Sequence, residues 1–120
     1  MAGNVPVQLH DYPDVPVPET MVKDREHSMR LETPLVGSVV NVYRDGGLAV
    51  GALVDHFEKK MPGLGWRLVS RFQDGSTVLV FTKEGRLALL GIGLERGSPT
   101  LSVIVGALGG PEMQPPVQRN

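Results

Sequence analysis

The stretch from Leu48 to Met61 constrains the fold most, because its apolar residues recur at helical spacing. Those residues are Val50, Leu53, Val54, Phe57 and Met61. Positions i, i+3, i+4, i+7 and i+11 lie on one face of an α-helix. The pattern therefore predicts one amphipathic helix, whose apolar face must cover another element to leave water.

Local signals mark both ends of this helix. Asp45 precedes the apolar pattern and is expected to cap the N-terminus. Pro62 and Gly65 follow the pattern, and both residue types end helices readily. Asp55 and Lys59 are four residues apart, so we expect them to form an ion pair on the exposed side of the helix.

Segments rich in β-branched residues, separated by turn residues, surround the helix and predict β-strands. Before the helix, one such segment covers 37–43 and a less defined one lies near 28–33. After it come 66–72, 77–83, 86–95 and 100–108, joined by turns at 73–75, 84–85 and 96–99. We predict an α+β fold: an antiparallel sheet of about five to six strands, in ββαββββ order, with the helix on one face.

The distribution of apolar residues over the two faces of the sheet raises a second question. The strand after the helix carries, on its more apolar face, Trp66, Leu68, Ser70 and Phe72. We expect that face to be buried. The strands over 86–95 and 100–108 are apolar on both faces. Because one helix covers only one face, these strands either curl round a second core or expose an outer face to a partner.

The chain divides by composition into three parts. A length of 120 residues suits a single domain. Residues 1–21 contain Pro6, Pro13, Pro16 and Pro18, which disfavour helix and predict an extended arm or linker. This segment is interpreted either as a tether or as an arm lying along the domain. Residues 22–108 form the predicted α+β domain, and 109–120 are expected to be a disordered tail.

Charge and composition exclude several classes of protein. The formal net charge is −1, which argues against a broad electrostatic grip on nucleic acid. The chain has no cysteine, so it contains neither disulfides nor thiolate chemistry. No apolar run approaches the ~20 residues of a transmembrane helix, and no signal peptide is recognisable.

No set of residues predicts catalysis or cofactor binding. The histidines, His10, His27 and His56, form no His-x-x-x-His pair, and His56 is expected on the surface. No serine lies in a Gly-x-Ser-x-Gly sequence. We therefore expect no catalytic, cofactor-binding or metal-binding residues, and we expect that the chain is not an enzyme. Gly91 and Gly93 are interpreted as a bend, a bulge or room for the helix to pack closely.

Four residues are candidates for contacts with a ligand or partner. Trp66 is expected to plug the joint between helix and sheet, and alternatively to form a ligand platform. Trp66 or Tyr43 could stand at the mouth of an apolar cavity between the sheet and the helix. Arg67 and Arg71, together with Arg86 and Arg96, form a basic stripe if the strands over 66–72 and 86–95 face the same way, and otherwise they are dispersed surface charges.

Short sequence patterns resemble a group of small, uncharacterised bacterial envelope lipoproteins. The patterns lie at Asp14–Pro18, His56–Leu68, Leu79–Lys83 and Thr100–Val103. In that group a proline-rich N-terminus leads into a domain with a Phe…Met-Pro…Gly-Trp joint between helix and strand. The resemblance implies export and lipid anchoring through a cysteine, which this chain lacks. It implies no activity and no catalytic residues.

These observations favour a non-catalytic module of the cell envelope, periplasmic or associated with the outer membrane. We expect it to bind a protein partner or a second copy of itself, as a homodimer, through its sheet. A membrane contact would need a lipid anchor that this chain lacks. Two alternatives are a small protein that binds an apolar ligand and a cytoplasmic domain of unknown function.

Overall fold

The computed structural model describes residues 6–9, 12–25, 29–30, 36–44 and 46–107, with only the backbone described at 29–30 and 36–40. The N-terminal elements are β1 (Val7–Gln8), β2 (Val17–Pro18), β3 (Val22–Lys23), β4 (Met29–Arg30) and β5 (Val36–Arg44). Then follow helix α1 (Val50–Lys60), the 3₁₀ turn η1 (Pro62–Leu64), β6 (Arg67–Asp74), β7 (Ser76–Lys83), β8 (Arg86–Glu95) and β9 (Ser98–Ala107).

The long strands form one antiparallel sheet. Its hydrogen-bonded path runs β3-β5-β9-β8-β7-β6, and β4 also pairs with β5. Strands β1 and β2 pair only with each other, as a separate two-stranded sheet. Within the described residues, the predicted α+β class with one helix and an antiparallel sheet is confirmed. The short strands β1, β2 and β3 were not predicted, because strands of two residues are too short to show a period-two pattern.

The predicted helix is present, although its first turn differs from the prediction. Helix α1 begins at Val50, and its capping position is Ala49, which makes no side-chain cap. The assignment of Asp45 as the cap is therefore wrong, and residue 45 itself lies outside the described ranges. The predicted ion pair between Asp55 and Lys59 is present, with Nζ and Oδ2 3.1 Å apart. The predicted tail at 109–120 and strand residues 31–33 lie outside the described part of the chain.

The joint between helix and sheet is a compact turn closed by Trp66. Backbone N–H groups of Leu64 and Trp66 donate to the Met61 carbonyl at 2.9 and 3.2 Å. Gly65 adopts a φ of 97°, a left-handed conformation that other residues rarely reach. Trp66 is 2% exposed and belongs to the core together with Phe57 and Met61. The expectation that Trp66 plugs this joint is confirmed.

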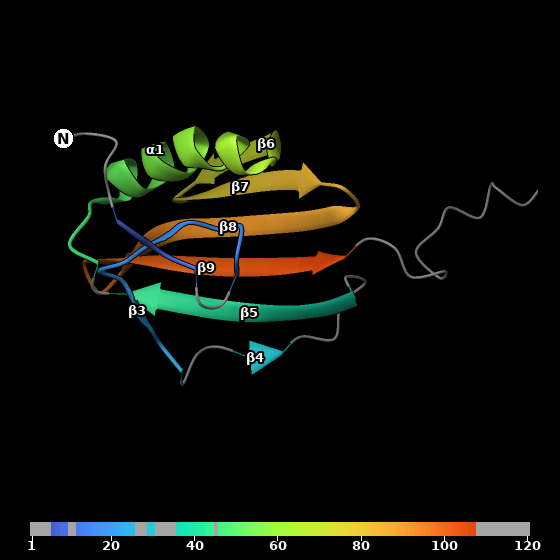
Figure 1. The fold of residues 1–120 in the computed structure, drawn as a ribbon. Helices are drawn as coiled ribbons and strands as arrows, with labels where there is room; N and C mark the ends of the chain where they lie inside the picture. Colours follow the sequence, from blue (N-terminus) through green and yellow to red (C-terminus); the bar gives the residue numbers. More distant parts are fainter. Residues whose placement is uncertain (1–5, 10–11, 26–28, 31–35, 45, 108–120) are drawn as a thin grey trace, which may run out of the picture.

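The core lies on one face of the sheet, here called the inner face. Helix α1 contributes Leu53, Val54 and Phe57 to it, and the N-terminal segment contributes Val15, Val17 and Met21. Figure 1 shows the helix beside β6 and β7, while the blue N-terminal segment crosses β8 and β9. Residues 12–21, called the arm below, therefore lie along the domain and share the inner face with the helix.

Strand β6 departs from the predicted pattern of burial. Leu68 is 40% exposed and Phe72 is 58% exposed, so the face expected to be buried is open. The reason is that β6 is an edge strand with a β-bulge between Leu68 and Ser70. The extra residue reverses the alternation of side chains, and Phe72 then lies on the face opposite the core.

Candidate functional site: the outer face of the sheet

The face of the sheet away from the helix carries a continuous group of apolar side chains. The pairing register places Leu89 between Val80 and Ile104, and Val78 beside Phe72. We call this group the outer strip; it consists of Phe72, Val78, Val80, Leu87, Leu89 and Ile104. Apart from exposed Phe72, these side chains are half-buried, whereas their neighbours on the inner face are fully buried. Of the two arrangements predicted for the strands that are apolar on both faces, the described residues adopt the open one.

The dimensions of the outer face are those of a protein interface. Strands β8 and β9 each contain 10 residues. With ~3.3 Å per residue and ~4.8 Å between strands, the five strands of 8 to 10 residues, β5 to β9, give the sheet a face of roughly 700 Å². A standard protein interface buries about 800 Å² on each partner, so the whole face, of which the outer strip is one part, is close to interface size.

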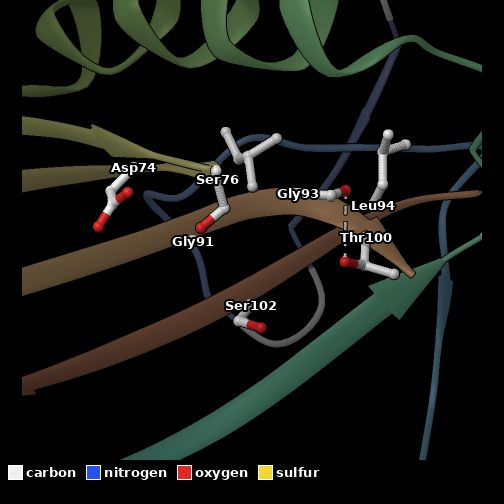
Figure 2. Close-up of a pocket in the computed structure, with 9 residues that line it drawn as sticks. Asp74, Ser76, Gly91, Gly93, Leu94, Thr100 and Ser102 are labelled. Carbon is white, nitrogen blue, oxygen red and sulfur yellow. Dashed lines mark hydrogen bonds between the residues drawn. The ribbon is translucent and has the colours of Figure 1, made fainter.

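Next to the outer strip lies a shallow hollow of about 460 Å³. Figure 2 shows Ser76, Thr100 and Ser102 around Gly91 and Gly93, where the strand has no side chains. A Cβ atom on Gly93 would lie 3.0 Å from the Cβ of Ser76, so a larger residue there would have to displace Ser76 slightly.

The interpretation of Gly91 and Gly93 as a bulge or as room for the helix is wrong, while the alternative of a bend stays a prediction. Strand β8 keeps an unbroken register with β9 through both residues. Because Leu90 and Ile92 face the core, the two glycines face outward, away from α1.

The two arginines predicted as contacts lie on opposite faces of β6. Arg67 pairs in register with Thr82 and lies on the outer side. Arg71 lies on the inner side, where its Nη1 contacts Glu58 Oε2 of the helix at 2.6 Å. The predicted basic stripe is therefore absent from this strand, because the bulge at Val69 places the two cations on different faces.

The two predicted aromatic contacts, Trp66 and Tyr43, lie in the core rather than at the mouth of a cavity. Tyr43 is fully buried on β5. The Trp66 indole Nε1 donates to the Asp14 carbonyl of the arm at 2.8 Å. The hypothesis of an apolar-ligand cavity thus loses both residues that were expected to stand at its entrance.

His56 corrects a further prediction, because it is buried rather than on the surface. Its side chain is 5% exposed, and its Nε2 lies 2.6 Å from the Pro16 carbonyl. Because a carbonyl only accepts, Nε2 carries the proton and donates it. Desolvation lowers the pKa of His56, and Lys60 lowers it further, while the Pro16 carbonyl and Asp55 act in the opposite direction.

An ion cluster at Asp14 joins the arm to the sheet. The Asp14 carboxylate accepts from Lys83 at 2.9 Å and from Arg86 at 2.6 and 3.3 Å. Both cations also lie over the Trp66 ring, at 5.7 and 5.0 Å from its centre. Burial raises the pKa of Asp14, but the hydrogen bonds and charges of Arg86 and Lys83 outweigh it, so the pKa lies below its ordinary value.

The chain matches no protein-family model, curated protein or solved structure. Within the described ranges, no three acidic, histidine or cysteine residues gather to hold a metal ion. In the same part of the chain, no helix combines the length and apolar character needed to cross a membrane. The outer strip and the arm contacts could be recognised only after the strand register and the bulge were known.

Proposed function

We propose that this chain is a non-catalytic module of the bacterial cell envelope that associates with a second copy of itself through the outer face of its sheet. The observation that carries this proposal is the outer strip, an apolar surface on a sheet whose other face is already covered. Burying this strip against apolar side chains of a partner stabilises the complex by about 25 cal/mol per Å² of apolar area removed from water.

A second copy fits this surface in area and in charge. A symmetric dimer buries the same patch twice, so one apolar strip provides both halves of the interface. The net charge of −1 gives two copies little mutual repulsion. If the two sheets stack with antiparallel β6 strands, Arg67 of one copy approaches Asp74 of the other, because these residues stand at opposite ends of β6.

The test of self-association is sedimentation velocity of the full chain over a range of concentrations. The wild-type mass is expected to rise toward that of a dimer. Leu89→Lys and Ile104→Lys place a charge in the centre of the strip and are expected to leave a monomer, because an unpaired charge in an apolar interface is costly.

Leu94→Lys is the matched control for those variants. Leu94 is 65% exposed at the end of β8 and points to the other side of the sheet. This variant is expected to dimerise like the wild type. A wild-type chain that stays monomeric at every concentration, or a Leu89→Lys variant that dimerises normally, would refute the proposed interface.

The assignment to the envelope rests on the resemblance in sequence. The residues that carry it, Phe57, Met61 and Trp66, all belong to the buried core. The direct test is metabolic labelling of the natural gene product with a radioactive fatty acid, followed by cell fractionation. Label on a membrane-bound product is expected, and an unlabelled cytoplasmic product would overturn the assignment.

A further inference from the structure

The inner face carries polar groups that are satisfied by the arm. Asn41 is 4% exposed on β5, and its Nδ2 donates to the Tyr12 hydroxyl at 2.8 Å. His56 and the Trp66 indole donate to backbone carbonyls of the arm, as described above. A purely apolar core would need none of these groups, and each would be costly if buried without a partner. Their positions match the backbone and side chains of one extended segment.

The same surface also recognises a carboxylate and two apolar side chains. Lys83 and Arg86 converge on Asp14, and both belong to strands of the main sheet. Val15 and Val17 are 0% and 2% exposed, and Val17 lies two residues after Val15. The domain therefore holds the arm through the charge of Asp14, through hydrogen bonds to the carbonyls of Asp14 and Pro16, and through burial of Val15 and Val17 in the core.

The arm docks on the domain through the kinds of contact that a bound peptide makes with its receptor, without adding a strand to the main sheet. The pairing of β2 is with β1 alone, and neither strand extends the main sheet. Extended proline-rich segments lose little conformational entropy on docking, and the grooves that bind them use aromatic residues and hydrogen bonds to carbonyl groups. The arm shows these properties on the surface formed by α1, Trp66 and the inner face, which we call the groove.

We propose that this groove is a peptide-binding site for an extended Asp-Val-Pro-Val-Pro segment, filled by the chain's own arm and open to the same segment of a second copy. The inference goes beyond the proposed function, since it concerns the inner face and not the outer strip. Exchange of arms between copies would place Asp14 of one molecule on Lys83 and Arg86 of the other. The free segment and the attached arm compete for one groove. Because the attached arm has a high effective concentration, it occupies the groove unless its docking is weakened.

The first experiment weakens the attached arm in the full chain and supplies the segment separately. Val15→Asp puts a charge where a fully buried side chain lies, so the arm of this variant is expected to leave the groove. The probe is a synthetic peptide of residues 6–21. Trp66 is the single tryptophan, and its indole contacts Asp14, so its fluorescence reports occupation of the groove.

The Val15→Asp variant is expected to bind the wild-type peptide with a saturable change in fluorescence. A peptide with Asp14→Asn is expected to bind at least roughly 10-fold more weakly, because it loses the charge that Lys83 and Arg86 recognise. The wild-type chain, with its groove filled, is expected not to respond. Adding Leu89→Lys to the Val15→Asp chain should leave peptide binding unchanged, which separates this inference from the dimer interface. A folded Val15→Asp variant that ignores the peptide, or binds both peptides equally, would overturn it.

A second measurement on the wild-type chain covers the case in which Val15→Asp fails to fold. Native-state hydrogen exchange compares the Trp66 indole N–H with the amides of β8 and β9. If the arm undocks as a separate unit, the indole is expected to exchange roughly 100-fold faster than those amides. Equal exchange rates would mean that the arm leaves only on global unfolding, and the groove would then be ordinary core.

Discussion

His56 shows at the residue scale how tertiary contacts change the properties of one side chain. On the isolated helix it would be partly in water, beside Asp55 and Lys60. The arm covers it and offers the Pro16 carbonyl to Nε2. The neutral ring satisfies this geometry, whereas a second proton would place a charge in a buried position. The pKa of His56 is lowered for this reason, since desolvation is its largest cause.

This shift predicts that the folded chain loses stability as the pH falls below about 6.5. The folded state binds a proton on His56 less readily than the unfolded state, whose ordinary pKa is 6.5. The contribution is fully present above that pH, and it is lost progressively as the pH falls toward the lower folded pKa. Urea denaturation at pH 7.5, 6.5, 5.5 and 5.0, values that bracket this ordinary pKa, measures the decline.

His56→Gln is the comparison for this experiment. The glutamine amide can donate to the Pro16 carbonyl and does not titrate. The unfolding free energy of this variant is therefore expected to stay level over the same pH range. Asp14 does not interfere, because its ordinary pKa is 3.8 and its folded pKa is lower still. A wild-type decline that persists unchanged in His56→Gln would show that another group is responsible.

At the scale of single elements, the joint after α1 and the edge strand β6 are the two features that depend on particular backbone geometry. Gly65 closes the joint at a φ of 97°, with Trp66 following it into the core. The bulge in β6 turns Phe72 outward and separates Arg67 from Arg71. Bulges and charged residues also limit unwanted pairing at a sheet edge, which leaves the outer strip as the more open surface.

Gly65→Ala is expected to lower the unfolding free energy by about 1 kcal/mol, because alanine rarely adopts a positive φ. Its Cβ would also lie 3.0 Å from Cε of Lys83. Gly63→Ala is the control, since a Cβ there meets nothing within 4 Å and no positive φ is required. Equilibrium denaturation gives the unfolding free energy of both variants. Equal values for the two would show that residue 65 does not require glycine at this joint.

At the scale of the whole molecule, two unlike segments share the task of covering the inner face. Helix α1 covers one part of the sheet and the arm covers another, as Figure 1 shows. The helix supplies an apolar stripe, whereas the arm combines Val15, Val17 and Met21 with a carboxylate and backbone carbonyls. The outer face has no comparable cover among the described residues. The two proposals, one for each face, follow from this difference.

The sequence by itself determined the helix, the turns and the four-strand segment after the helix, because these depend on local periodicity and on residues such as Gly85 and Gly97 that favour turns. The sequence also determined that Trp66 closes the joint, since a large aromatic side chain directly after the end of a helix packs where the helix meets the sheet. Only the tertiary structure decided the burial of His56, the outward position of Phe72 and the docking of the arm. Each of these depends on contacts between segments distant in sequence, or on a single bulged residue that changes the face of a strand. A proline-rich stretch carries no periodic signal of its own, so its partners on the inner face appear only when the sheet has formed.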